Sequence, residues 1–421
     1  MAMSTKRIST QGHVESGAYA RESGTNGKSI TFAELLPDIQ QLVADAMSIR
    51  EAVLWSGVSK VDRQLVVERI KRVSALTGHP WNFASASLFP NDISLRVAVE
   101  HKRSIEDNAM IIFADAIVSG ALVQTHTLDL GWNNIGDKGL KAFADACASG
   151  VLENLQELHL CRNKITDVGF ATLFPLLEKG GKLAGLTSFA IGSDITGGGV
   201  KAFAGVLASG GLAQLTKLEL SYDDIDDIGL TALANACANG ALPQLTSLHL
   251  VNNNIGSVGI AALAACANRA FVHVNRMDLA YNAICDVGLI ALVDACANGA
   301  FAHLIHMDIE NNSISDVGLT AFANACANKA LVNITHLDIS DNEFGDDGLS
   351  ALATACENGA LAYLRFLNIN ENPIGDDGLS ALAAACDNAK LPCLKMLIVE
   401  DIDHEALSAV CLERNIKLEP R

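Results

Sequence analysis

Two histidines and two aspartates recur with the same spacing late in the chain. His306 and Asp308 are separated by one residue, and His336 and Asp338 repeat the pattern 30 residues later. Imidazole nitrogens and carboxylate oxygens are ligands of divalent metals, so two such pairs on neighbouring strands would offer a four-ligand set. Both pairs belong to a unit that recurs along the chain, and repetition alone accounts for them. We therefore predict no metal site and keep metal binding as the alternative.

The sequence contains no pattern that indicates catalysis. Gly-x-Ser-x-Gly, His-Glu-x-x-His and Cys-x-x-Cys do not occur, so neither a nucleophile with its base nor a redox or zinc motif is visible. Seven cysteines occupy one helical position of successive units: Cys147, Cys237, Cys266, Cys296, Cys326, Cys356 and Cys386. We expect them to be buried thiols in a reducing compartment. We predict a non-enzyme without a cofactor.

The elements that position these residues come from an internal repeat. A glycine recurs at intervals of 30 residues, with one of 29, at Gly139, Gly169, Gly199, Gly229, Gly259, Gly288, Gly318, Gly348 and Gly378. Each unit runs as an alternating Leu-x-Leu strand, a turn with an asparagine, and an Ala/Cys-rich helix, and an aspartate two residues before the glycine suits the helix N-cap. Parallel strands lie about 4.8 Å apart, whereas helices need roughly 8 to 10 Å. Stacked units must therefore bend into a horseshoe with the strands on the concave side.

The repeat resembles a known family. The pattern Leu-x-x-Leu-x-Leu-x-x-Asn-x-Ile-x-Asp-x-Gly-Leu resembles leucine-rich repeats of the ribonuclease-inhibitor type, which are shared by Ran GTPase-activating proteins and the sensor arms of NOD-like receptors. The resemblance extends from about Leu95 to the end of the chain. It implies an α/β fold, a right-handed leucine-rich-repeat solenoid with a parallel concave sheet and convex helices. It also implies a GTPase-activating or ribonuclease-inhibitor-like regulator as an alternative function.

The main functional prediction concerns the concave side, where side chains next to the strand leucines would meet a partner. We predict that this protein is an interaction scaffold and that its binding residues are Asp129, Trp132, Arg162, Glu219, Tyr222, Asp278, Tyr281, Asp308, Glu310, Asp338 and Asp341. Asp278, Asp308 and Asp338 occupy one equivalent position and should repel one another. We expect Arg276, His306 and His336 to offset part of that repulsion. An acidic column of this kind favours a basic partner.

Five segments of the chain are distinguished by composition. Residues 1–29 are predicted to be a disordered tail. Residues 30–90 carry two amphipathic helical patterns, which form either a cap or an F-box, since residues near 35–60 resemble the module of ubiquitin-ligase substrate receptors. Residues 91–120 form a degenerate first repeat with a strand at Leu95, Val97 and Val99. Nine regular repeats follow at 121–393, of which the third (from Phe189) is one residue short in its turn and lacks the asparagine. Residues 394–421 are predicted to cap the array.

The charge of the chain is unevenly distributed. The net charge is −18; residues 1–104 hold 13 Lys/Arg and 10 Asp/Glu, and the remainder holds 17 and 38. The solenoid segment therefore carries −21, which disfavours nucleic acid and membrane surfaces. Since no long apolar segment is present, we predict a monomeric cytoplasmic protein with a protein partner.

Overall fold

The computed structural model describes residues 92–94, 105–118, 122, 125–388, 390–400 and 402–419. The predictions for the tail, for the helical segment with its F-box resemblance and for the strand at Leu95, Val97 and Val99 lie outside these residues. The first described strand is Asp92–Ser94, which precedes the predicted one and pairs Asp92 with Thr127.

One parallel sheet runs through the molecule, with its strands in chain order. Each strand is three residues long and pairs in register with the next, as Leu128 does with Leu158. The strands are β1 (Asp92–Ser94), β2 (Thr127–Asp129), β3 (Glu157–His159), β4 (Ser188–Ala190), β5 (Lys217–Glu219), β6 (Ser247–His249), β7 (Arg276–Asp278), β8 (His306–Asp308), β9 (His336–Asp338), β10 (Phe366–Asn368), β11 (Met396–Ile398) and β12 (Lys417–Glu419). We number the regular repeats so that repeat 1 begins with β2 and repeat 9 with β10.

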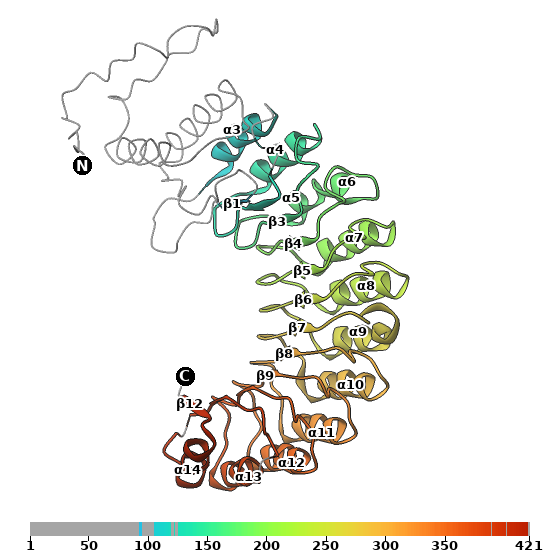
Figure 1. Ribbon diagram of the computed structural model, residues 1–421. Helices are drawn as coiled ribbons and strands as arrows, with labels where there is room; N and C mark the ends of the chain where they lie inside the picture. The colour runs from blue at the N-terminus through green and yellow to red at the C-terminus, as the bar shows by residue number, and fades with distance from the viewer. Residues whose placement is uncertain are drawn as a thin grey trace, which may run out of the picture.

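A helix follows nearly every strand and packs on the outer side of the arc (Figure 1). The helices are α3 (Asp107–Val118), α4 (Asp137–Cys147), α5 (Asp167–Ala171), α6 (Phe174–Leu177), α7 (Gly197–Ala208), α8 (Asp227–Ala238), α9 (Ser257–Ala270), α10 (Cys285–Ala297), α11 (Asp316–Ala327), α12 (Asp346–Glu357), α13 (Asp376–Asp387) and α14 (Glu405–Arg414). The strands line the inner side, because helices need more room than strands. The predicted horseshoe is confirmed.

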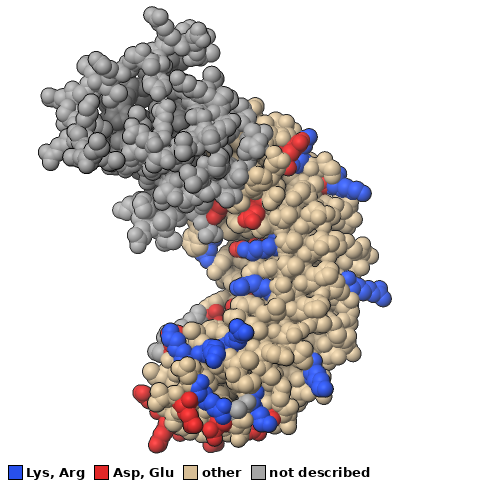
Figure 2. Space-filling view, in the orientation of Figure 1, with Lys and Arg blue, Asp and Glu red and all other residues tan. Residues whose placement is uncertain are grey.

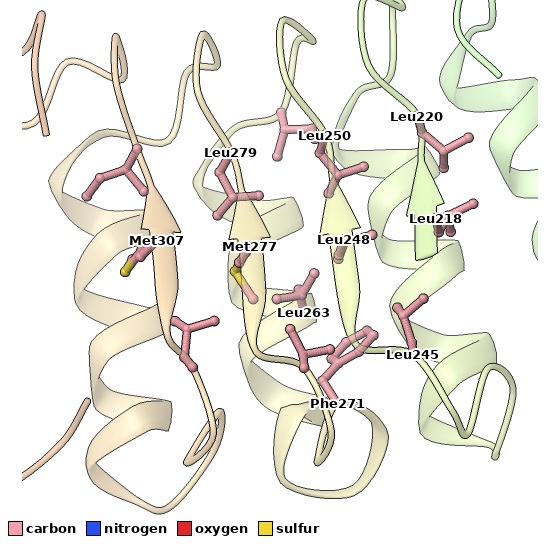
Figure 3. Packing of buried hydrophobic residues seen from close by; sticks show 14 of the residues in the cluster. Leu218, Leu220, Leu245, Leu248, Leu250, Leu263, Phe271, Met277, Leu279 and Met307 are labelled. Carbon is pink, nitrogen blue, oxygen red and sulfur yellow. The ribbon is translucent and has the colours of Figure 1, made fainter. Parts of the chain in front are cut away.

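The core lies between the sheet and the helices. The middle residue of each strand points into it, so Leu218, Leu248, Met277 and Met307 form one buried row (Figure 3). The seven repeated cysteines are buried in the same core, and all eleven cysteines of the chain are free thiols. Burial raises the pKa of the Cys237 thiol to about 12. These thiols therefore behave as small apolar groups.

The helix of repeat 2 is interrupted, which the sequence analysis did not predict. It is split into α5 and α6, with Pro175 in the first turn of α6. Proline has no N–H and suits the first turn of a helix, so a new helix starts there. Phe170 lies against Phe174 and Phe203, with ring centroids 5.0 and 5.1 Å apart. Phe170 and Phe203 are fully buried, so these rings belong to the core of this irregular region.

A ladder of buried asparagines joins the turns. We call the residues at this position, from repeat 1 to repeat 9, the asparagine ladder: Asn133, Asn163, Ser193, Asp223, Asn253, Asn282, Asn312, Asn342 and Asn372. Oδ1 of Asn342 accepts from the backbone N–H groups of Asn312 and Ile314 in the preceding repeat. Its Nδ2 donates to the carbonyl oxygens of Ile309 and Ile339. One amide thus supplies both the acceptors and the donors that a buried turn needs.

The repeated aspartate does not cap its own helix, so this prediction was wrong. Oδ1 of Asp316 accepts from the backbone N–H groups of Gly345 and Gly348, at the start of the next repeat's helix. Each aspartate therefore satisfies the orphan N–H groups of the following helix, where the helix dipole also favours a carboxylate. The arrangement requires glycine, because a Cβ on Gly348 would lie 2.7 Å from Asp316 Oδ1.

Candidate functional site

The predicted binding residues lie in two columns that run along the concave side. The acidic column consists of Asp278, Asp308 and Asp338, each the last residue of its strand. The turn column consists of the residues three positions further along: Trp132, Arg162, Tyr222, Asn252, Tyr281, Asn311, Asp341 and Glu371. Asp129 and Glu219 take the strand position of the acidic column in repeats 1 and 4, and Glu310 lies between the two columns.

Every member of the turn column has a left-handed backbone, with φ between +51° and +66°. This conformation aims the N–H group at the next repeat, so that Trp132 N donates to Cys161 O and Tyr281 N donates to Glu310 O. Asparagine tolerates the conformation, whereas bulky side chains are uncommon in it. The residues Trp132, Tyr222 and Tyr281 are nevertheless 36%, 40% and 38% exposed.

Three members of the turn column form a stack. The Cζ atom of Arg162 lies 4.2 Å from the centroid of the Trp132 ring and 3.5 Å from that of the Tyr222 ring. The guanidinium is therefore held between two aromatic faces, each of which attracts a cation. Repeat 3 has no residue at this position, so Arg162 and Tyr222 meet although they belong to repeats 2 and 4.

The acidic column places three carboxylates on neighbouring strands. Asp278 pairs with Asp308 and Asp308 with Asp338 in the sheet register. Carboxylate oxygens of Asp308, Glu310 and Asp338 all lie within 4.8 Å of one another. Burial, followed by the charges of Asp278 and Asp338, raises the pKa of Asp308 to about 8. This site favours a cationic group, because a cation would relieve the repulsion among the carboxylates.

The histidines do not join this cluster. The rings of His306 and His336 stack at the start of their strands, with centroids 5.6 Å apart, and His336 also stacks on Phe366 at 6.0 Å. Burial, with Arg276 as the next cause, lowers the pKa of His306 to about 4 and also lowers that of His336. Both rings are neutral at pH 7. The expectation that these histidines offset the charge of the acidic column was therefore wrong.

The remaining predicted residues have local partners. The carboxylate of Asp129 is buried and accepts from Gly131 N at 3.0 Å. Glu219 forms an ion pair with Lys217 at 3.0 Å. The hydroxyl group of Tyr281 donates to Glu310 Oε1 at 2.9 Å, and Asn311 Nδ2 donates to the carboxylate of Asp341. The structure thus joins Tyr281 to the acidic column through Glu310 and leaves Asp129 away from the surface.

The family comparison agrees with this architecture. A family model described as "Leucine Rich repeat" matches residues 126–144, 151–173, 242–264, 302–323, 331–353 and 360–383. These six segments are leucine-rich repeats. The matches leave out residues 174–241, which contain the irregular third leucine-rich repeat. No curated protein matches the chain in sequence.

Solved structures of similar fold share little sequence with the chain. An internalin, InlF of Listeria monocytogenes, is 20% identical with a TM-score of 0.42, over 71% of this chain and 81% of that one. A TDR receptor is 16% identical with a TM-score of 0.36, over 73% and 48%. The TLR13–ssRNA13 complex is 16% identical with a TM-score of 0.33, over 71% and 46%. The chain thus spans less than half of the matched chains in the last two structures, and no function follows from these likenesses.

One exposed row on the leucine-rich-repeat helices was not predicted from the sequence. The residue before the repeated glycine is aliphatic and 60% to 72% exposed in five repeats, at Val168, Ile228, Val258, Val287 and Val317. The recurring Asp-Val-Gly triplet was a signal for it, since the position follows the first residue of the helix. In Figure 2 charged side chains are sparse over the middle repeats and gather towards the C-terminal end.

A groove was also missed. It has a volume of about 860 Å³ and follows the edge where the strands begin, lined among others by Thr216, Thr246, Thr335, Tyr363 and Arg365. None of the helices in the described part of the chain has the length and hydropathy of a membrane-spanning segment.

Proposed function

We propose that this protein binds a protein partner across the concave side of its leucine-rich repeats, through the turn column and the acidic column. The observation that carries the proposal is the backbone conformation of the exposed aromatic residues. Trp132, Tyr222 and Tyr281 are left-handed, a conformation that costs about 1 to 2 kcal/mol in a residue other than glycine.

Other left-handed residues of the chain are buried, and their burial offsets the cost of this backbone conformation. Leu212, Leu242, Phe301, Leu331 and Leu361 are also left-handed, but each is at most 5% exposed. Burying such a side chain contributes about 1.5 to 3 kcal/mol, which exceeds the strain. The exposed rings of the turn column gain much less from burial, and Asn252 and Asn311 fill the same position without a bulky group. Exposed Trp, Tyr and Arg are the residue types that dominate protein interfaces.

The acidic column supports a partner with basic side chains. Oδ1 of Asp308 accepts from Glu310 N, and Oδ1 of Asp338 accepts from Ser340 N, so each aspartate has a local role in its turn. Asn368 fills the same role in repeat 9, where its Oδ1 accepts from Asn370 N. The negative charge is therefore unnecessary for the turn. A Lys or Arg side chain of the partner would be favoured between these carboxylates.

The decisive experiment compares two triple variants in affinity capture followed by mass spectrometry. The first changes Trp132, Tyr222 and Tyr281 to Asn, the residue that repeats 5 and 7 already use. The second changes Val168, Val258 and Val317 to Asn and serves as the control for loss of exposed apolar area. We expect the first variant to lose at least about 90% of the captured partner, as for a change of 1.4 kcal/mol or more. Loss of capture in the valine variant alone would place the interface on the helices.

Two alternative functions remain predictions. An F-box would lie in residues 30–90, and a pull-down of the full chain with a ubiquitin-ligase adaptor tests it. A GTPase-activating function rests on the resemblance of the repeats, and single-turnover GTP hydrolysis by small GTPases tests it. We favour binding over catalysis, because the concave side presents stacked rings and carboxylates rather than a nucleophile with a base.

A further inference from the structure

We propose that Arg162 is an anchor for a carboxylate group of the protein partner. This inference rests on the proposed function of the concave side and assigns a second, oppositely charged contact to it. The acidic column in repeats 6 to 8 takes basic groups, and Arg162 in repeat 2 takes an acidic one.

The stack holds the guanidinium in a binding-competent orientation. Its two faces lie against the rings of Trp132 and Tyr222, with Cζ at 4.2 and 3.5 Å from the ring centroids. The N–H groups of a guanidinium lie in its own plane, so the rings leave the donor edges uncovered. This planar fork matches a carboxylate in a bidentate pair. Since the rings already restrict the side chain, less rotamer entropy remains to be lost on binding.

The irregular third repeat creates the space for the stack. Turns in repeats 2 and 4 lie two strand spacings apart, or about 10 Å. A regular repeat 3 would place a side chain between Arg162 and Tyr222. Its turn is one residue short, and Gly192 passes so close to repeat 4 that a Cβ would lie 2.0 Å from Ser221 O. The deletion and the glycine therefore open the gap that the guanidinium fills.

The charges around Arg162 select a carboxylate over a phosphate. Within the part of the chain that the structure describes, Arg162 forms no ion pair, and Glu219, on the strand that precedes Tyr222, is paired with Lys217. A half-buried guanidinium without a counter-ion favours an incoming anion. The strands around it also carry Asp129 and Glu157, and the solenoid segment is strongly acidic. Repulsion from these groups is greater for a dianion than for a single carboxylate.

The test follows the side-chain Nε–Hε signal of Arg162 by NMR in the full chain labelled with ¹⁵N-arginine. The signal is assigned by its loss in Arg162→Lys. The probes are the peptide Ac-Gly-Glu-Gly-NH₂, its neutral counterpart Ac-Gly-Gln-Gly-NH₂, and inorganic phosphate. We expect a saturable downfield shift with the Glu peptide and about tenfold weaker binding of the Gln peptide, because charge-assisted bidentate pairs are the stronger ones.

Tyr222→Asn tests the role of the stack, since Asn occupies this position in repeat 5. We expect an unchanged melting temperature within a few degrees and a weaker Glu-peptide affinity, by about threefold or more. Equal shifts with the Glu and Gln peptides, tighter binding of phosphate, or full affinity in Tyr222→Asn would each overturn the proposal. None of these measurements involves the protein partner. The proposal for Arg162 can therefore be contradicted while the capture experiment still supports binding through the turn column.

Discussion

The asparagine ladder is complete in repeats 7 to 9 and altered in repeats 3 and 4. The side chain of Asn342 bonds the turn of the preceding repeat and its own turn, whereas the Ser193 hydroxyl group contacts only Asn163 N and Gly192 O among the described residues. Asp223 still accepts from the N–H groups of Ser193 and Ile195, but its Oδ2 is buried among the described residues without a hydrogen-bond partner. The same buried position therefore changes from fully satisfied to unsatisfied when an amide becomes a carboxylate.

The repeated aspartates, each of which caps the helix of the following repeat, form a second ladder that we call the aspartate ladder, and it is interrupted at the same place. Gly197 replaces the aspartate of repeat 3, so nothing on that helix can cap the next one. Asp226 instead caps its own helix, accepting from the N–H groups of Ile228 and Gly229. A Cβ on Gly197 would lie 1.8 Å from Asp226 Oδ1, so the two changes require each other. Both ladders are therefore interrupted in repeats 3 and 4, the region that the stack of Arg162 with Tyr222 spans.

The largest expected effect comes from breaking the intact ladder. Asn342→Ala leaves the N–H groups of Asn312 and Ile314 and the carbonyl group of Ile309 without their side-chain partner, while Ile339 O still accepts from Asn372 Nδ2. At about 1 to 3 kcal/mol for each buried unsatisfied group, we expect a loss of at least about 3 kcal/mol in the free energy of unfolding, measured in urea. Ser193→Ala is the matched control and should cost about 1 kcal/mol. Equal losses would mean that the two regions do not differ.

Gly318→Val should disrupt the aspartate ladder locally. A Cβ there would lie 2.4 Å from Asp286 Oδ1, the atom that accepts from Gly318 N. We expect a destabilisation of about 2 to 3 kcal/mol, which is typical of an overpacked site. In a solenoid each repeat contacts its neighbours only, so hydrogen exchange should increase mainly in repeats 6 to 8. A uniform loss of protection across all repeats would contradict this account.

Asp223→Asn should repair the ladder and remove a pH dependence. Burial raises the pKa of Asp223 to about 7 from an ordinary value of 3.8. The folded state therefore binds more protons between these values, and its stability falls as the pH rises from about 4 to 7. We expect the variant to be about 2 kcal/mol more stable at pH 8 and nearly equal at pH 4. A variant less stable than wild type at pH 8 would show that the carboxylate is needed.

The smallest effect is expected from the acidic column. Changing Asp278, Asp308 and Asp338 to Asn keeps the Oδ1 acceptor, as Asn368 does in repeat 9. Because the pKa of Asp308 is raised to about 8, stability should fall from about pH 4 to 8 in wild type and change less in the variant. We expect a gain of about 1 kcal/mol at pH 8, measured in urea.

The same triple variant should weaken partner capture and reduce its dependence on salt, because screening acts on the lost charge pairs. Capture by wild type should strengthen as the pH rises through 8, since Asp308 must lose its proton to bind a cation. A sharp loss of stability with unchanged capture would assign the column to the fold alone.

The sequence by itself determined the repeat, its strand–turn–helix order and the inward direction of the leucines and cysteines. It also placed Asp278, Asp308 and Asp338 in one column, because a constant period carries equivalent residues to equivalent positions. These features follow from local periodicity, which is visible in a single chain.

Only the tertiary structure decided which groups meet between repeats. The aspartates cap the neighbouring helix, His306 and His336 are neutral, and Arg162 reaches Tyr222 across repeat 3. Each of these depends on the distance between residues about 30 to 60 positions apart and on how much water their packing excludes. Periodicity sets the face on which a side chain lies, but stacking and burial set its partner and its charge.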